Sequence, residues 1–219
     1  MKTHDVARPS QPTESFDLAG RSAGQMAREQ AVELRHQAPV KTFLARLLGV
    51  KTDERNWRVG ADGEERVGRM LERKLPDGWY VLNAVPVGER GSDIDHVVVG
   101  PAGVFTVNTK HHPQGKLWVG ERAIMINGQR TDYLRNSKFE AERSEKFLTR
   151  ACGFRVPVSA VLVVICEKMS IKQMPGAVTV LPPSQVARWL TNQTVRYPPG
   201  EIEAIYSVAR QSSTWHNVG

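Results

Sequence analysis

Cysteine is scarce in this sequence, with only Cys152 and Cys166 among 219 residues. Two cysteines without a CxxC or cysteine-histidine spacing provide neither a disulfide framework nor a zinc site. The sequence also lacks an unbroken apolar run of the roughly 18 to 20 residues that a membrane span requires, and its first residues contain no apolar signal-peptide core. We therefore expect a cytoplasmic protein with reduced cysteines and no stable membrane insertion.

A concentrated basic run is absent as well, although the formal net charge is +7. The excess of Lys and Arg over Asp and Glu is +3 in residues 1–60, +1 in residues 61–150 and +3 in residues 151–219. A dispersed positive charge supports phosphate binding only weakly and fits an ordinary solvated surface equally well. Charge alone therefore identifies no partner.

The chain divides into three expected parts. Residues 1–22 are polar and aperiodic, which predicts a disordered tail. Residues 23–59 read as a helical extension, in which apolar positions at 40–48 recur at helical spacing beside basic side chains. That stretch could pack on its own domain, lie on a membrane surface or contact a protein partner. Residues 60–219 are expected to form one domain, in which residues 151–219 complete the core.

This domain shows alternating helix and strand patterns, which predict an α/β fold with a mixed central sheet flanked by helices. Asp62 and Glu65 have the spacing of a capping box, so a helix is expected over about 63–75, ending before Pro76. Strands are expected at 79–87, 93–99, 103–109, 156–166 and 177–181, a hairpin at 116–126, and helices at 136–150, 184–192 and 199–210.

The helix expected at 63–75 has one apolar face, whose positions recur at helical spacing: Val67, Met70, Leu71 and Leu75. Extending this stripe toward the N-terminus reaches Glu64, which we therefore expect to point toward the core. An acid in a first turn could instead simply complement the helix dipole. The helix dipole explains why an acid occurs in the first turn, but not why it lies on the core-facing side of the helix.

Charged and amide side chains occur in two neighbouring strands, where Asp in particular is unusual. Because strand side chains alternate, Asp93 and Asp95 share one face of their strand. Asn108 and Lys110 share one face of the next strand, with Thr109 opposite. Only a short turn separates the two strands, which makes them natural neighbours. We therefore expect Asp95 to lie beside Asn108 and Lys110.

With Glu64 entering from the helix, two carboxylates, an amide and an amine would meet. Such a set suits phosphodiester hydrolysis, because carboxylate oxygens hold Mg²⁺ or Mn²⁺ and the ion lowers the pKa of a bound water. A lysine can orient that water or stabilise the charge that gathers on the phosphate. The alternative is a structural ion pair between Asp95 and Lys110 that closes a strand end. These residues alone favour neither interpretation.

Three blocks of this sequence, taken together, resemble the nuclease-related domain, NERD, an outlying branch of the PD-(D/E)xK nuclease superfamily. The blocks are "GADGEERV" at 60–67, "GSDIDHVVVGPAGVFTVNTKHH" at 91–112 and "YLRNSKFEAER" at 133–143. The resemblance covers roughly residues 60–150, and the order and spacing of the blocks are more specific than any one block.

The resemblance implies a restriction-endonuclease-like core with a Mg²⁺-dependent nuclease site. It carries the helix acid onto Glu64, the acid of "IDH" onto Asp95 and the strand lysine onto Lys110. Periodicity points to the same three positions. Asp95 and Glu64 would bind the metal, Asn108 would be a weaker ligand, and Thr109 would contribute its backbone carbonyl.

Asn108 departs from the superfamily pattern, which has Glu or Asp two residues before the lysine. An amide oxygen can ligate Mg²⁺, but the loss of one negative charge weakens such a site. Asp93, Glu140, or His111 and His112 are the groups that could compensate. The catalytic set expected from the sequence is therefore Glu64, Asp95, Asn108 and Lys110.

His111, His112 and Lys116 are candidate contacts for nucleic acid. Histidine is a poor Mg²⁺ ligand at neutral pH but can contact a phosphate or carry a proton. For both histidines the alternative is a solvated or loop-capping role.

We expect a metal-dependent nuclease that acts on DNA, with RNA as the other possible substrate. The alternative is a nucleic-acid-binding or regulatory module that keeps the fold without catalysis, because fold does not determine function. A protein-binding adaptor that uses the segment at 40–49 is the third possibility. Binding of Mg²⁺ or Mn²⁺ separates the first interpretation from the others.

Overall fold

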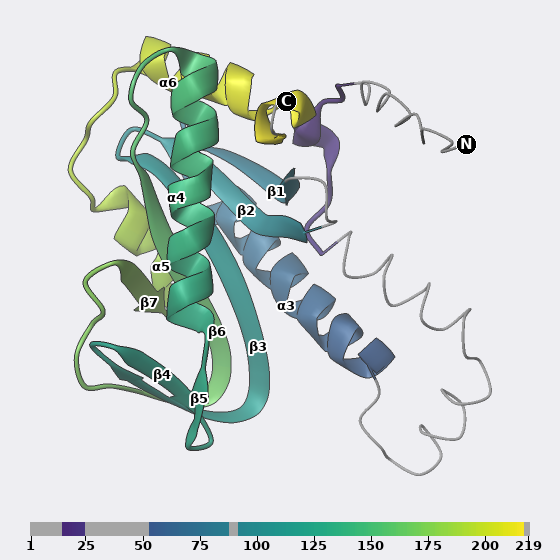
Figure 1. Ribbon diagram of the computed structural model, residues 1–219, viewed down its shortest axis with the longest axis vertical. Coiled ribbons are helices and arrows are strands. Elements are labelled where there is room, and N and C mark those ends of the chain that lie inside the picture. Colours follow the sequence, from purple (N-terminus) through teal and green to yellow (C-terminus); the bar gives the residue numbers. More distant parts are fainter. Residues whose placement is uncertain (1–14, 25–52, 88–91, 217–219) are drawn as a thin grey trace, which may run out of the picture.

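The computed structural model describes residues 15–24, 53–87 and 92–216. They form a mixed seven-stranded open sheet with helices packed on both faces (Figure 1). This architecture confirms the predicted α/β class. In the part of the chain described, no helix is long and apolar enough to cross a membrane.

The strands follow the chain in this order: β1 (Tyr80–Val87), β2 (Ser92–Gly100), β3 (Gly103–Gly120), β4 (Ala123–Ile126), β5 (Gln129–Thr131), β6 (Val158–Ile171) and β7 (Val178–Leu181). The helices of the described part are α3 (Asp53–Lys74), α4 (Tyr133–Cys152), α5 (Pro183–Thr191) and α6 (Pro199–Ala209). Two short 3-10 helices flank them: η1 (Leu18–Gly20) and η2 (Ser212–Trp215).

β3 is the central strand of the sheet and has a different arrangement on each edge. β6 runs parallel beside one edge along nearly the whole length of β3. The opposite edge pairs with β2 as far as Val107 and with β4 from Leu117 onward. Between those two positions, the described strands leave this edge of β3 unpaired. The sheet is therefore open beside the stretch that carries Asn108 and Lys110.

Apolar side chains of the sheet pack against helices on both sides. On one face, Val67 and Leu71 of α3 and Leu190 of α5 join a buried cluster with Val98 and Val107. On the other face α4, α6 and η2 cover the sheet. Because helices cover both faces of the sheet, the central strands are apolar at successive positions and not only at alternate ones.

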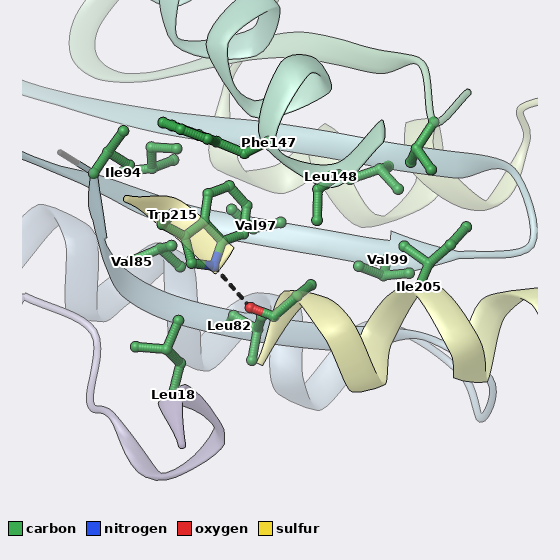
Figure 2. Packing of buried hydrophobic residues seen from close by; sticks show 14 of the residues in the cluster. Leu18, Leu82, Val85, Ile94, Val97, Val99, Phe147, Leu148, Ile205 and Trp215 are labelled. Carbon is green, nitrogen blue, oxygen red and sulfur yellow. Dashed lines mark hydrogen bonds between the residues drawn. The ribbon is translucent and has the colours of Figure 1, made fainter. Parts of the chain in front are cut away.

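Trp215 of η2 lies at the centre of the cluster on the α4 and α6 side (Figure 2). Its ring is completely buried, and its Nε1 donates a hydrogen bond of 2.8 Å to the carbonyl oxygen of Ala209. Phe147 of α4 meets it edge to face. A buried tryptophan with a satisfied N–H anchors the C-terminal helices onto the sheet.

The first half of β6 is buried on both faces, as its apolar sequence predicts. Val161 and Val163 belong to the cluster under α3 and α5. Leu162 and Val164 belong to a separate cluster with Ala141 of α4. The strand is longer than the expected 156–166, because its second half continues to pair with β3.

The predicted strands 103–109 and 116–119 are in fact two halves of the single strand β3. Pro113 and Gly115 suggest that one strand ends and another begins here. Instead, the pairing register of β3 with β6 shifts between His112 and Lys116, and the two strands stay paired on both sides of that shift. The hairpin to β4 is confirmed, with Gly120 paired to Ala123. β5 was not predicted.

The start of α3 was predicted wrongly, although its end before Pro76 was correct. The helix begins at Asp53, so Asp62 lies inside it and is no N-cap. The capping-box pattern also occurs by chance within helices. Gly63 has a packing role instead: a Cβ added there would lie 2.8 Å from Cβ of His111, so glycine lets α3 approach β3 closely.

The prediction of a disordered tail over 1–22 is wrong for residues 15–22. Leu18 is completely buried, and its backbone N donates to the carbonyl oxygen of Arg210 at 2.7 Å. Asp17 forms an ion pair with the Arg210 side chain. Residues 1–14 lie outside the described residues, as does most of the predicted helical extension, including its apolar stretch at 40–48.

Candidate functional site

Asp95 lies where β2 separates from the edge of β3. The last pair of that ladder is His96 with Val107. One position further, Oδ2 of Asp95 accepts a hydrogen bond from the backbone N–H of Thr109. The carboxylate thus takes the place of a backbone partner, and only 8% of Asp95 is exposed. This contact explains how an acid is accommodated inside the sheet.

Asn108 on the opened edge of β3 is paired with an acid from α4. Its Nδ2 donates a hydrogen bond of 3.0 Å to Oε2 of Glu140. Its Oδ1 is buried and has no hydrogen-bond partner. A buried acceptor without a donor is uncommon, so this oxygen is available to a ligand. Glu140 brings a carboxylate directly to the strand position where the sequence has an amide.

Glu64 reaches the same place from α3, on the side that the apolar stripe predicts. Burial, followed by the negative charges of Asp95 and Asp93, raises the pKa of Glu64 to about 8. Burial and the charge of Asp95 raise the pKa of Asp93 to about 6. Both carboxyl groups are therefore held near other negative charges in a partly desolvated space.

Burial is also the largest cause of the raised pKa values of Glu140 and Asp95. Burial, followed by the charge of Asp95, raises the pKa of Glu140 to about 7, against the hydrogen bond from Asn108. Burial also raises the pKa of Asp95, against the positive charge of Lys110. The charge of Asp95 thus raises the pKa values of Glu64, Asp93 and Glu140, and we call these four carboxyls the carboxylate cluster.

Lys110 is a positive group beside this cluster. Its charge lowers the pKa values of Glu64, Asp95 and Glu140. Its Nζ lies 5.7 Å from the centroid of the Tyr133 ring at the start of α4. The ion pairs formed by the described residues include none between Lys110 and Asp95. Lys110 and Asp95 therefore interact through their charges without a direct ion pair.

The two histidines after Lys110 are engaged with protein groups. Nδ1 of His111 lies 2.8 Å from the carbonyl oxygen of Val59, which fixes β3 to α3. Nε2 of His112 lies 2.7 Å from the Tyr133 hydroxyl, and the two rings stack with centroids 5.9 Å apart. Both contacts agree with structural roles. Nucleic-acid contact by either histidine stays a prediction.

Lys116 and Thr109 also occupy defined places. Lys116 is exposed near the hairpin to β4, where its backbone N donates to Oδ1 of Asn127. Thr109 is buried beside Val163 of β6, and its Oγ1 has no hydrogen-bond partner. Their assignments as a nucleic-acid contact and a metal ligand stay predictions.

Sequence reasoning did not single out Tyr133, and it named Glu140 only as one of several compensating groups. Both belong to the block "YLRNSKFEAER", where they are seven residues apart. That spacing is two helical turns, so it places both on one face of α4. The spacing of Tyr133 and Glu140 is the sequence signal that could have identified this face of α4 as part of the site.

The oxygen donors of the site have the chemistry that a hard divalent cation prefers. Glu64, Asp95 and Glu140 provide carboxylates, and Asn108 provides the unpartnered amide oxygen. Across residues 15–24, 53–87 and 92–216, however, no three His, Cys, Asp or Glu side chains are arranged as ligands of one ion. The donor set therefore fits Mg²⁺ in kind, and the side chains would have to move together to bind it.

Comparison with known proteins identifies the domain that holds this site. Residues 59–165 match the nuclease-related domain, NERD, and the whole carboxylate cluster lies within this range. An uncharacterised protein of Bacillus anthracis is 39% identical over 77 residues, which are 34% of this chain and 35% of that protein. The chain thus spans about a third of the curated relative that it matches. No solved structure matches the chain significantly. Residues 59–165 therefore belong to the nuclease-related domain family.

Proposed function

We propose that this protein is a Mg²⁺- or Mn²⁺-dependent nuclease that hydrolyses phosphodiester bonds of DNA, or of RNA, at the carboxylate cluster. The observation that supports it most strongly is the convergence of four carboxyls, each with a raised pKa, beside Lys110 at the opened edge of β3. Repulsion of this kind costs folding free energy, which is typical of a site kept for function.

Glu64, Asp95 and Glu140, together with Oδ1 of Asn108, are the groups that would hold the cation. A bound Mg²⁺ or Mn²⁺ supplies a water of lowered pKa and neutralises charge on the phosphate. Lys110 donates hydrogen bonds from its ammonium group to the attacking water or to a phosphate oxygen. Glu140 replaces the acid that the strand lacks at position 108.

The buried Asp95 has a second role in holding the site together. Its carboxylate accepts the Thr109 N–H, so it fixes the distance between β2 and β3 at the point where they separate. Asp95→Asn keeps an acceptor for that N–H while it removes the charge. Asp95→Ala leaves the N–H unsatisfied, which costs about 1–3 kcal/mol. Asn is therefore the substitution that tests the chemistry.

The test is a calorimetric titration of Mg²⁺ and Mn²⁺ into the wild type and Asp95→Asn. The wild type should bind with release of protons at pH 7, because carboxyls that are partly protonated must ionise to become ligands. Repeating the titration in buffers of different ionisation enthalpy measures that release. Asp95→Asn should stay folded and lose at least tenfold in affinity. Wild type without affinity for either ion would refute the proposal.

A non-catalytic nucleic-acid-binding module is the second candidate. The specific observation in its favour is Asn108, which leaves the strand position neutral. Such a module would bind oligonucleotides equally well in Mg²⁺ and in a chelator and would cleave none. Binding without cleavage in Mn²⁺ would favour it over the nuclease.

A further inference from the structure

Residues 15–24 form a segment, which we call the N-terminal strap, that lies outside the family match and ends with Ala23 and Gly24 against α3. A Cβ added at Gly24 would lie 2.7 Å from the carbonyl oxygen of Ala61, and one added at Gly68 would lie 2.6 Å from Cβ of Ala23. Glu64 is three residues after Ala61 and four before Gly68. The end of the strap therefore lies on the face of α3 from which Glu64 projects.

Arg21 is the charged residue that the strap brings to this place. Its carbonyl oxygen accepts from Nδ2 of Asn83 at 3.4 Å, which ties its backbone to β1. Its guanidinium carbon lies 5.8 Å from the centroid of the Phe16 ring. The buried Leu18 and the ion pair of Asp17 with Arg210 fix the strap on the other side.

No hydrogen-bond acceptor for the guanidinium of Arg21 occurs in the part of the chain that the structure describes. Its Nε is buried without a hydrogen-bond partner. Among the described residues, no carboxylate forms an ion pair with it. Asn83, to which the Arg21 backbone is bonded, also has its Oδ1 2.8 Å from Nδ1 of His96, the residue that follows Asp95. An arginine held in place with free donors is suited to a phosphate group.

We propose that Arg21 is a phosphate-binding residue of the candidate site, and that it holds the nucleic-acid backbone beside the carboxylate cluster. This inference rests on the proposed function for the identity of its ligand. It extends the site beyond the nuclease-related domain, since Arg21 precedes residue 59. It also gives the N-terminal strap a role in binding and not only in stability.

The test measures binding of labelled single- and double-stranded oligonucleotides by fluorescence anisotropy in a chelator, at several salt concentrations. Arg21→Ala should weaken binding roughly tenfold and reduce the slope of log affinity against log salt by about one. Arg21→Lys should recover part of the affinity, because it keeps the charge and loses the planar fork. Arg196→Ala is the matched control; it removes an equal charge from the connection between α5 and α6.

Thermal melting of each variant shows whether the fold is intact, and all three should melt within a few degrees of the wild type. Equal loss of affinity in Arg21→Ala and Arg196→Ala, or an unchanged affinity and salt slope in Arg21→Ala, would overturn the inference. If the wild type binds nucleic acid through Arg21 but does not cleave it, the inference about Arg21 stands while the nuclease proposal fails. If the wild type cleaves nucleic acid and Arg21→Ala binds it as tightly as the wild type does, the inference about Arg21 fails while the nuclease proposal stands. Absence of any binding at low salt would refute the inference about Arg21, whereas metal titration and cleavage test the nuclease proposal separately.

Discussion

The neutral Asn108 is the residue on which the chemical interpretation depends most. Its side chain donates a hydrogen bond to Glu140, so a carboxylate lies beside this position. If Glu140 replaces the missing strand acid, the two groups should be exchangeable. A carboxylate on either residue would then serve the same cation.

Exchange of the two groups is a direct test of this replacement. Glu140→Gln should weaken Mg²⁺ binding at least tenfold, because it removes one negatively charged ligand. The double variant Asn108→Glu, Glu140→Gln should recover most of that affinity, since it returns the acid to the strand. Calorimetric titration of the two variants and the wild type measures both effects. The idea fails if Glu140→Gln binds Mg²⁺ as the wild type does.

The position of α3 against β3 decides where Glu64 lies, and it depends on one glycine. Gly63 allows the helix to approach His111 so closely that a Cβ does not fit without a shift. Gly60, one turn earlier in the same helix, has no atom of the described residues within 4 Å of an added Cβ. The two glycines therefore form a matched pair.

Gly63→Ala should destabilise the protein by about 1–3 kcal/mol, as overpacking of a close contact does. Gly60→Ala should instead stabilise it by up to about 1 kcal/mol, because alanine favours the helix. Urea unfolding curves of both variants measure the difference. Gly63→Ala should also weaken Mg²⁺ binding, since α3 carries Glu64. A stabilised Gly63→Ala variant would show that the close approach is not required.

Sequence periodicity predicted the positions of side chains that depend on one element, while the roles of these side chains in the site stay predictions. The apolar stripe of Val67 and Leu71 placed Glu64, and strand alternation placed Asp95 beside Asn108. Local patterns could not show how α4 crosses β3, and so could not choose Glu140 among the possible compensating groups. The role of Leu18 was also hidden, because a single apolar residue in a polar stretch has no period.

At the scale of the whole molecule, the strap and the C-terminal region contact each other. The strap pairs with the C-terminal region through Asp17 and Gln211, and Leu18 joins the same core as Trp215. Figure 2 shows these two side chains in one cluster. Segments on both sides of the nuclease-related domain therefore support its sheet, and the repulsion within the carboxylate cluster opposes this stabilisation.

The stability of the metal-free protein should fall as pH rises from about 6.5 to about 8.5. The pKa values of Glu64 and Glu140 are raised to about 8 and about 7, so in this window the folded protein holds protons that the unfolded chain has released. Deprotonation therefore removes stability. Burial lowers the pKa of His96 to about 3, so this group affects stability only at lower pH, where the unfolded chain takes up its proton.

Thermal melting in a chelator at several pH values measures this dependence. Glu64→Gln should flatten the fall, because it removes the carboxyl with the highest of these pKa values, and Mg²⁺ should reduce it in the wild type. An exposed acid such as Glu203 provides the control, and Glu203→Gln should leave the slope unchanged. A melting temperature that rises or stays level across this range would contradict the electrostatic description of the cluster.

The central claim is that phosphodiester hydrolysis takes place at this cluster, and a cleavage assay tests it most directly. Labelled single- and double-stranded DNA and RNA are incubated with the wild type, Asp95→Asn, Lys110→Met and Lys172→Met. Lys172 follows the far end of β6 and is exposed, so its variant controls for the loss of one lysine. Cleavage should require Mg²⁺ or Mn²⁺, persist in Lys172→Met and fall roughly hundredfold or more in the other two variants. Absence of cleavage by the wild type with either ion, or equal cleavage by all four proteins, would contradict the account.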